Sequence, residues 1–187
     1  IHLDKDQVDI DGQAILFASG IYAKIPNDLS EQLVLSALDV AGAPAQVAKL
    51  VKPNDSVLIL GAAGKSGVLC AYQAKKNAGT NGRVIGLVNE QKLYDELKAL
   101  NICDKIIIAD AKDPVAVHHE VLKHNNNQLA DVVINCVNVP DTEMAAILSA
   151  KPSGVIYFFS MATSFTKAAL GAEGVASEAD MIIGNGY

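Results

Sequence analysis

The chain has 187 residues, a length that suits one well-buried domain, or one domain with part of another. Its net charge of -6 at pH 7 would repel a polyanionic backbone, so we expect no nucleic-acid partner. Its apolar runs are far shorter than the roughly 20 residues of a membrane span, and no signal peptide is recognisable. We therefore expect a cytoplasmic protein with no membrane partner.

The first 55 residues differ in pattern from the rest of the chain. Three short segments there have strand-like patterns: 7–10, 14–18 and 21–26. Helical spacing then runs from residue 28 to residue 50, with Ser30 as a weak candidate for its N-cap. The three predicted strands have no obvious partner in the sequence that follows. We therefore expect residues 1–27 to be the tail end of a truncated domain and residues 28–187 to form a second domain.

From Ser56 onward, short apolar runs alternate with helical segments, which is typical of repeated β-α units. Six runs predict strands: 57–61, 83–88, 105–109, 131–136, 154–159 and 180–184. The segments between them predict helices: 65–78, 90–100, 113–124, 140–150 and 165–173. Several strands are apolar at successive residues, as expected for strands that helices cover on both faces. We expect an α/β fold, a doubly wound Rossmann domain whose six parallel strands have the order 3-2-1-4-5-6.

A glycine-rich loop lies between the first of these strands and the helix after it. Its sequence is Gly61-Ala62-Ala63-Gly64-Lys65-Ser66-Gly67. Glycines there allow a tight turn and a close approach of the backbone to phosphates, and the helix N-terminus favours an anion. The spacing GxxGxxG differs from the dinucleotide pattern GxGxxG by one displaced glycine, so a turn without a ligand stays an alternative. A P-loop would need glycine at Ile59, inside the strand, which argues against a nucleotide triphosphatase.

We therefore expect a nicotinamide dinucleotide to bind across the carboxyl ends of the strands. Asn89 and Glu90 follow the second strand and could hydrogen-bond the adenine ribose, although Glu90 could simply begin the next helix. Because no arginine stands there to bind a 2′-phosphate, NAD is favoured and NADP is the alternative. The candidate cofactor-binding residues are Gly61, Ala63, Gly64, Lys65, Ser66, Gly67, Asn89, Glu90, Cys136, Val137, Asn138, Ser160 and Met161. The strand end at 109–110 is a further position for contacts.

Neither a metal site nor a disulfide framework is predicted. His118, His119 and His124 share one predicted helix, but their spacing does not match the i, i+4 pairing of two metal-binding imidazoles. A solvated helix face is the simpler interpretation, and we expect no metal. The chain has 3 cysteines without CxxC spacing, so we expect reduced thiols that act as packing residues.

Three consecutive motifs point to a known family: Ala41-Gly42-Ala43-Pro44-Ala45 in a helix, the proline-and-acid turn and strand from Val51 to Gly61, and the glycine loop. With these motifs, the stretch from Asp28 to Ser160 resembles the cofactor domain of the medium-chain dehydrogenase/reductase superfamily. The resemblance implies an NAD(P)-dependent oxidoreductase with a small-molecule amino-acid substrate. It also implies a GroES-like catalytic domain, of which residues 1–27 would be the remnant.

The same resemblance implies that this chain is a fragment and inactive alone, because zinc ligands and substrate-binding residues would lie largely outside it. We therefore assign no catalytic residue. Family members dimerise, so a homodimer that pairs through the strand at 180–184 is expected. The alternatives are the cofactor domain of another medium-chain dehydrogenase or quinone reductase, and a non-catalytic module that senses NAD(H).

Overall fold

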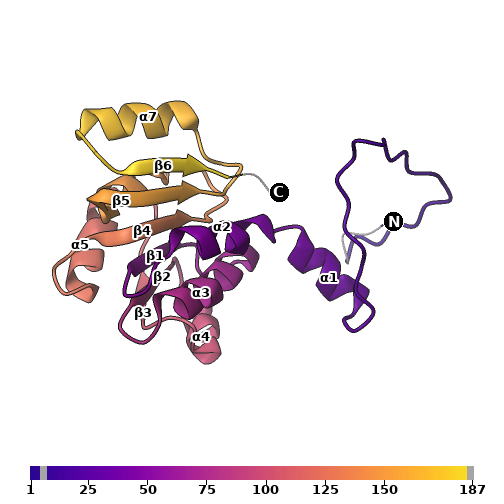
Figure 1. The fold of residues 1–187 in the computed structure, drawn as a ribbon, viewed down its shortest axis with the longest axis horizontal. Coiled ribbons are helices and arrows are strands. Elements are labelled where there is room, and N and C mark those ends of the chain that lie inside the picture. The colour runs from indigo at the N-terminus through magenta and orange to yellow at the C-terminus, as the bar shows by residue number, and fades with distance from the viewer. Residues whose placement is uncertain (5–7, 185–187) are drawn as a thin grey trace.

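The computed structural model describes residues 1–4 and 8–184. In this part of the chain, a six-stranded parallel sheet has the strand order β3-β2-β1-β4-β5-β6 (Figure 1). The strands are β1 (Ser56–Leu60), β2 (Arg83–Val88), β3 (Lys105–Ile108), β4 (Ala130–Asn135), β5 (Ala150–Phe158) and β6 (Asp180–Ile183). The predicted doubly wound sheet and its strand order are confirmed.

Helices cover both faces of this sheet. One face carries α2 (Gly42–Leu50), α3 (Lys65–Ala78) and α4 (Gln91–Leu100). The other face carries α5 (Pro114–His124), α6 (Glu143–Ser149) and α7 (Phe165–Gly174). The helix α1 (Glu31–Leu38) lies apart from both layers, beside the N-terminal segment (Figure 1).

Successive side chains of each strand pack into different layers of the core. In β1, Val57 and Ile59 belong to the cluster under α2, α3 and α4, whereas Leu58 and Leu60 belong to the cluster under α5, α6 and α7. Side chains of a strand point alternately to the two faces, so a sheet covered on both faces needs apolar residues at every position. The uninterrupted apolar runs of the sequence have this origin.

The strands predicted before residue 27 are wrong. Within residues 8–26 the structure contains no strand; residue 7, where the first of these predictions begins, lies outside the described residues. Apolar side chains of this segment are exposed, among them Ile15 at 84% and Phe17 at 75%. A strand forms only with a partner for its backbone groups, and alternation in the sequence does not supply one.

The single helix predicted over residues 28–50 is two helices. Ser30 caps α1 as predicted, since its hydroxyl accepts a hydrogen bond from the amide of Leu33 at 3.4 Å. A continuous helix would press the ring of Pro44 against the carbonyl of Val40, so the chain bends and α2 starts just before the proline. Within the described residues no single helix is long and apolar enough to cross a membrane. Among the described helices, only α1 and α2 taken together are long and apolar enough for a membrane span, and this pair is bent by 52°.

The other elements lie close to their predicted ranges, with one clear difference. The structure ends α6 at Ser149 and begins β5 directly at Ala150, several residues before the predicted strand. Ala150 pairs with Ala130, and the register then shifts before Val132 pairs with Val155. An irregular register of this kind has no local signal in the sequence.

Candidate functional site

The glycine loop turns sharply between β1 and α3. Gly61 has a φ of +75°, and its amide and that of Ala62 both donate to the carbonyl of Leu87 at 3.0 Å. The amide of Gly64 donates back to the carbonyl of Gly61 at 3.1 Å. A side chain on Gly61 would be strained at this φ and would lie 3.2 Å from the amide nitrogen of Val137. The first glycine thus lets the loop fit between the ends of β2 and β4.

The third glycine brings α3 against the loop. Gly67 is buried, and a Cβ there would lie 2.7 Å from Cα of Ala62, closer than real Cβ contacts. The helix begins at Lys65 with no side-chain cap and no acidic residue in its first turn. Its free amides and its positive dipole end therefore face the space above the loop, an arrangement that favours an anion.

A pocket of about 390 Å³ lies over the carboxyl ends of the strands, beside this loop. Most of the predicted site residues line it: Gly61, Ala63, Gly64, Lys65, Ser66, Asn89, Cys136, Val137 and Asn138. The strand end formed by Ala109 and Asp110 also contributes. The structure therefore brings together the loops after β1, β2, β3 and β4, the place where ligands bind to open α/β sheets.

Four predicted residues lie outside this pocket. Gly67 is covered by the loop, and Glu90 is the exposed N-cap residue of α4. Ser160 uses its hydroxyl within its own loop, where it accepts a hydrogen bond from the amide of Ala162 at 3.1 Å. Met161 is fully exposed. The loop after β5 thus stays away from the cavity wall.

The pocket also contains residues that the sequence analysis missed: Leu87, Val88, Leu93, Ala111 and Val139. Leu93 stands in the first turn of α4, and its apolar character just after a strand end is a signal that could have indicated it. The others are ordinary apolar residues of strand ends and loops. Nothing in the sequence distinguishes them from core residues.

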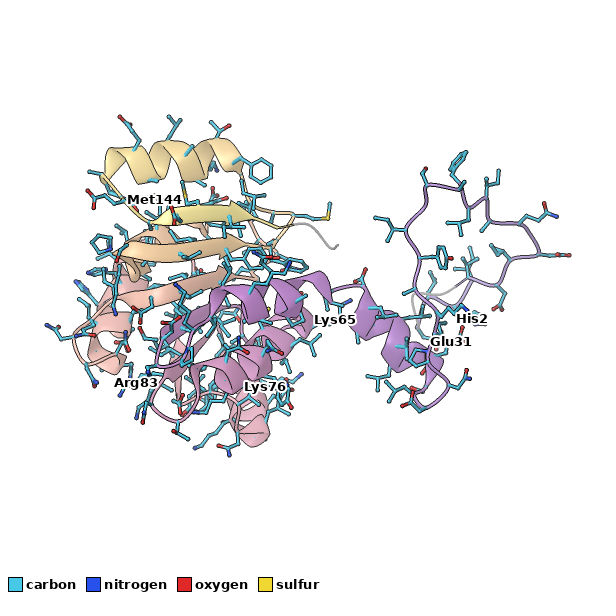
Figure 2. The ribbon with its side chains drawn as sticks, viewed as in Figure 1. His2, Glu31, Lys65, Lys76, Arg83 and Met144 are labelled. Atoms are coloured by element: carbon cyan, nitrogen blue, oxygen red, sulfur yellow. The ribbon has the colours of Figure 1, made fainter. Side chains whose placement is uncertain are left out.

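Lys65 is the one positively charged residue in the described lining of the pocket, and it is already paired. Its ammonium lies 2.7 Å from a carboxylate oxygen of Asp39, the residue that follows α1. Figure 2 shows Lys65 on the side of the sheet domain that faces α1, while Arg83 lies at the opposite end of the strands. Both partners of the pair are exposed, so water and salt weaken the attraction. A bound phosphate could share this ammonium with Asp39.

Cys136, which lines the pocket, lies close to the buried Cys70. Sγ of Cys136 donates a hydrogen bond to Sγ of Cys70 at 4.0 Å. This hydrogen bond and burial raise the pKa of Cys136 well above its ordinary value. Burial and the nearby Asp104 raise the pKa of Cys103 to about 12. The cysteines are free thiols, as predicted, and both shifted thiols stay protonated at neutral pH, which makes them poor nucleophiles.

The histidines predicted to lie on one helix do lie on α5. Nδ1 of His118 lies 2.7 Å from the carbonyl oxygen of Leu148 and so links α5 to α6. His124 contacts Glu120 of the preceding turn at 3.2 Å. Among residues 1–4 and 8–184, no group of three or more His, Cys, Asp or Glu side chains could hold a metal ion.

Known proteins match nearly the whole chain. It is 63% identical over 184 residues to L-erythro-3,5-diaminohexanoate dehydrogenase of Acetoanaerobium sticklandii, and 60% identical over 182 residues to the enzyme of that name from Fusobacterium nucleatum. The alignments cover 98% and 97% of this chain. This chain is a close homologue of part of these dehydrogenases. It spans about half of their length, because the alignments cover 54% and 53% of the two diaminohexanoate dehydrogenases.

Solved structures of proteins with very different sequences have the same fold. Mycobacterial Rv1454c complexed with NADPH matches with a TM-score of 0.72 and 19% identity, over 87% of this chain and 49% of that chain. The alcohol dehydrogenase of Aeropyrum pernix matches with a TM-score of 0.65 and 17% identity, over 86% of this chain and 46% of that chain. No protein-family model matches the chain. The diaminohexanoate dehydrogenase homologue therefore shares its Rossmann-like fold with proteins of very different sequence.

Proposed function

We propose that this chain is the NAD(P)-binding domain of an L-erythro-3,5-diaminohexanoate dehydrogenase. The observation that carries the proposal is the 63% identity over nearly the whole chain, together with a pocket built on the glycine loop. The reaction is an oxidative deamination of the kind used in lysine fermentation. When bound, the nicotinamide would accept a hydride from the carbon that bears the 3-amino group while the amine nitrogen loses a proton, and water would hydrolyse the resulting imine to 5-amino-3-oxohexanoate and ammonium.

The pocket suits a dinucleotide that lies across the sheet. The N-terminus of α3 would hold the pyrophosphate, with Lys65 as an additional cation. The ends of β2 and β3 would receive the adenosine half, where Asn89 and Asp110 line the wall. The other half, which carries the nicotinamide, would then lie toward β4. NAD is the preferred form and NADP the alternative, because Lys65 is the only positively charged residue in the described lining of this pocket.

The alignments cover only about half of each relative. We propose that the rest of the active site lies in the other half. We propose that residues 1–27 are a remnant of a GroES-like catalytic domain, that residues 28–187 are the cofactor domain, and that this piece is inactive alone. In support, α1 and the described N-terminal segment lie on the side of the sheet toward which the strands point (Figure 1). A cytoplasmic location and a homodimer through the edge strand β6 stay predictions.

Calorimetry tests the binding part of this proposal. We expect the protein to bind NAD or NADP in a saturable manner and to bind neither ATP nor S-adenosylmethionine with similar affinity. Those two ligands represent nucleotide hydrolases and methyltransferases, which also use glycine-rich loops. Failure of both nicotinamide dinucleotides to bind would contradict the proposal.

A further inference from the structure

A buried asparagine closes the loop after β4. Asn135 is the last residue of that strand and has no exposed surface. Its side-chain nitrogen donates to the hydroxyl of Thr142 at 2.9 Å, and its side-chain oxygen accepts from the amide of Val137 at 3.1 Å. The two ends of the loop 136–142 are therefore fastened to one side chain.

A buried glutamate fastens the same region to the next loop. Glu143, the first residue of α6, is only 2% exposed. Its carboxylate accepts a hydrogen bond from the amide of Ser164 at 2.7 Å, and Ser164 is the N-cap residue of α7. An ion pair between Asp141 and Lys167 spans the same two segments on the surface. The loops after β4 and β5 are thus joined by one part-buried hydrogen bond and one exposed ion pair.

Polar side chains such as Asn135 and Glu143 cost more free energy to bury than apolar side chains do. Burial of a carboxylate or an amide costs free energy unless hydrogen bonds replace those of water. The neighbouring buried residues of α6 are Ala145, Ala146 and Ile147, so apolar packing is available in this layer. What a satisfied polar network adds is a single defined arrangement of the backbone that it holds.

The backbone held in this way forms one wall of the pocket. Cys136, Val137, Asn138 and Val139 line the cavity, and all four lie within the loop that Asn135 closes. Neither Asn135 nor Glu143 lines the cavity. Any effect of these two side chains on a ligand must therefore pass through the position of the loop.

We propose that Asn135 and Glu143 are positioning residues that hold the loop 136–142 in the form that receives the nicotinamide half of the cofactor. This inference rests on the proposed function. A dinucleotide on a doubly wound sheet lies across the point where the strand order reverses, between β1 and β4. With the adenosine half over β2 and β3, the loop after β4 contacts the other half. Loss of the hydrogen bonds of either Asn135 or Glu143 should therefore weaken binding of the nicotinamide half only.

The test compares two ligands on the full-length enzyme: the reduced dinucleotide that the wild type binds, and ADP-ribose, which lacks the nicotinamide. For Glu143→Ala we expect affinity for the dinucleotide to fall about tenfold, the size of one lost hydrogen bond to a charged group, with affinity for ADP-ribose nearly unchanged. Glu143→Gln keeps an oxygen acceptor for the amide of Ser164 and should restore most of the loss. Glu173→Ala removes an exposed carboxylate from α7 and is the matched control.

Thr142→Val provides a milder variant that keeps the volume of the side chain and removes the hydroxyl that accepts a hydrogen bond from Asn135 at 2.9 Å. It should show the same difference between the two ligands, even if Glu143→Ala fails to fold. The positioning role would be overturned if a variant lost the same affinity for the dinucleotide and for ADP-ribose. It would also be overturned if neither Thr142→Val nor Glu143→Ala lost affinity for either ligand. A wild type that binds neither NADH nor NADPH would instead refute the proposed function, from which the positioning role is drawn.

Discussion

Single glycines decide the shape of the pyrophosphate end of the pocket. Gly61 is needed for its positive φ, and Gly67 for the close approach of α3 to Ala62. Both requirements are local, so the spacing of glycines in the sequence was enough to predict this part of the site. The positions of Ser160 and Met161 were not predictable in the same way. The course of the loop after β5 depends on distant partners such as Glu143, which the sequence does not pair with it.

Gly67→Ala should disturb the contact between α3 and the glycine loop. The new methyl group would collide with backbone atoms of Gly61 and Ala62, so we expect a loss of stability of about 1–3 kcal/mol, typical of overpacking, and weaker dinucleotide binding. Urea unfolding and a cofactor titration measure the two effects. Gly174→Ala is the control, because nothing lies within 4 Å of a Cβ there. Equal behaviour of the two variants would be evidence against close packing at Gly67.

The pair between Lys65 and Asp39 gives a second prediction. If Lys65 contributes to phosphate binding, Lys65→Ala should lower the affinity for NAD(P). Asp39→Asn should raise it a few-fold at low salt, because it removes a competing negative charge. Both effects should shrink as salt is added. Titrations at two salt concentrations measure them, and an Asp39→Asn variant that binds more weakly than the wild type would contradict this role.

At the scale of elements, apolar runs and turn residues indicated the sheet and its helices correctly, because each strand is buried on both faces. The same reasoning failed before residue 27, where alternation and apolar runs found no neighbouring strand. It also joined α1 and α2, although Pro44 marks the break between them. Helices and strands can thus be predicted where burial produces the pattern, but not where the pattern lacks a partner.

Asp131 joins the amino ends of three strands and leads to a pH prediction. Its carboxylate accepts from the amide and hydroxyl of Ser56 in β1 and from Lys151 in β5. Burial alone would raise its pKa, but the hydrogen bonds from Lys151 and Ser56 outweigh burial and hold the pKa below its ordinary value. The ionised form therefore stabilises the fold above the unfolded pKa of about 3.9, and this contribution disappears as pH falls toward the lowered folded pKa.

We expect Asp131→Asn to cost about 1–2 kcal/mol at neutral pH, a value reduced by the partial exposure of the site. The cost should diminish below about pH 4, where the unfolded wild type begins to take up a proton, and disappear once the pH falls below the lowered pKa of the folded state. Urea unfolding of the two proteins across this range measures the difference. Asp180→Asn at an exposed position of β6 serves as the control. A cost that stays constant down to the lowest pH would contradict the assigned ionic contribution.

At the scale of the whole molecule, the described sheet ends in two edges, and we expect assembly through the one beyond β5. The strand β6 forms that edge, and its Met181 and Ile183 are 38% and 52% exposed. An unpaired edge strand with apolar side chains can pair with a second copy across a two-fold axis. We expect Ile183→Lys to shift the full-length protein toward the monomer in light scattering. Leu170→Lys changes an exposed apolar residue of α7 and should leave the oligomeric state in light scattering unchanged.

A single assay tests whether the dinucleotide pocket serves oxidation of the diamino acid. Full-length protein is mixed with L-erythro-3,5-diaminohexanoate and either NAD or NADP, and formation of the reduced nicotinamide is followed. Simple alcohols serve as the comparison substrates. We expect reduction of at least one dinucleotide with the diamino acid, ammonium release in equal amount, and little reaction with the alcohols. Turnover of alcohols without turnover of the diamino acid would contradict this expectation.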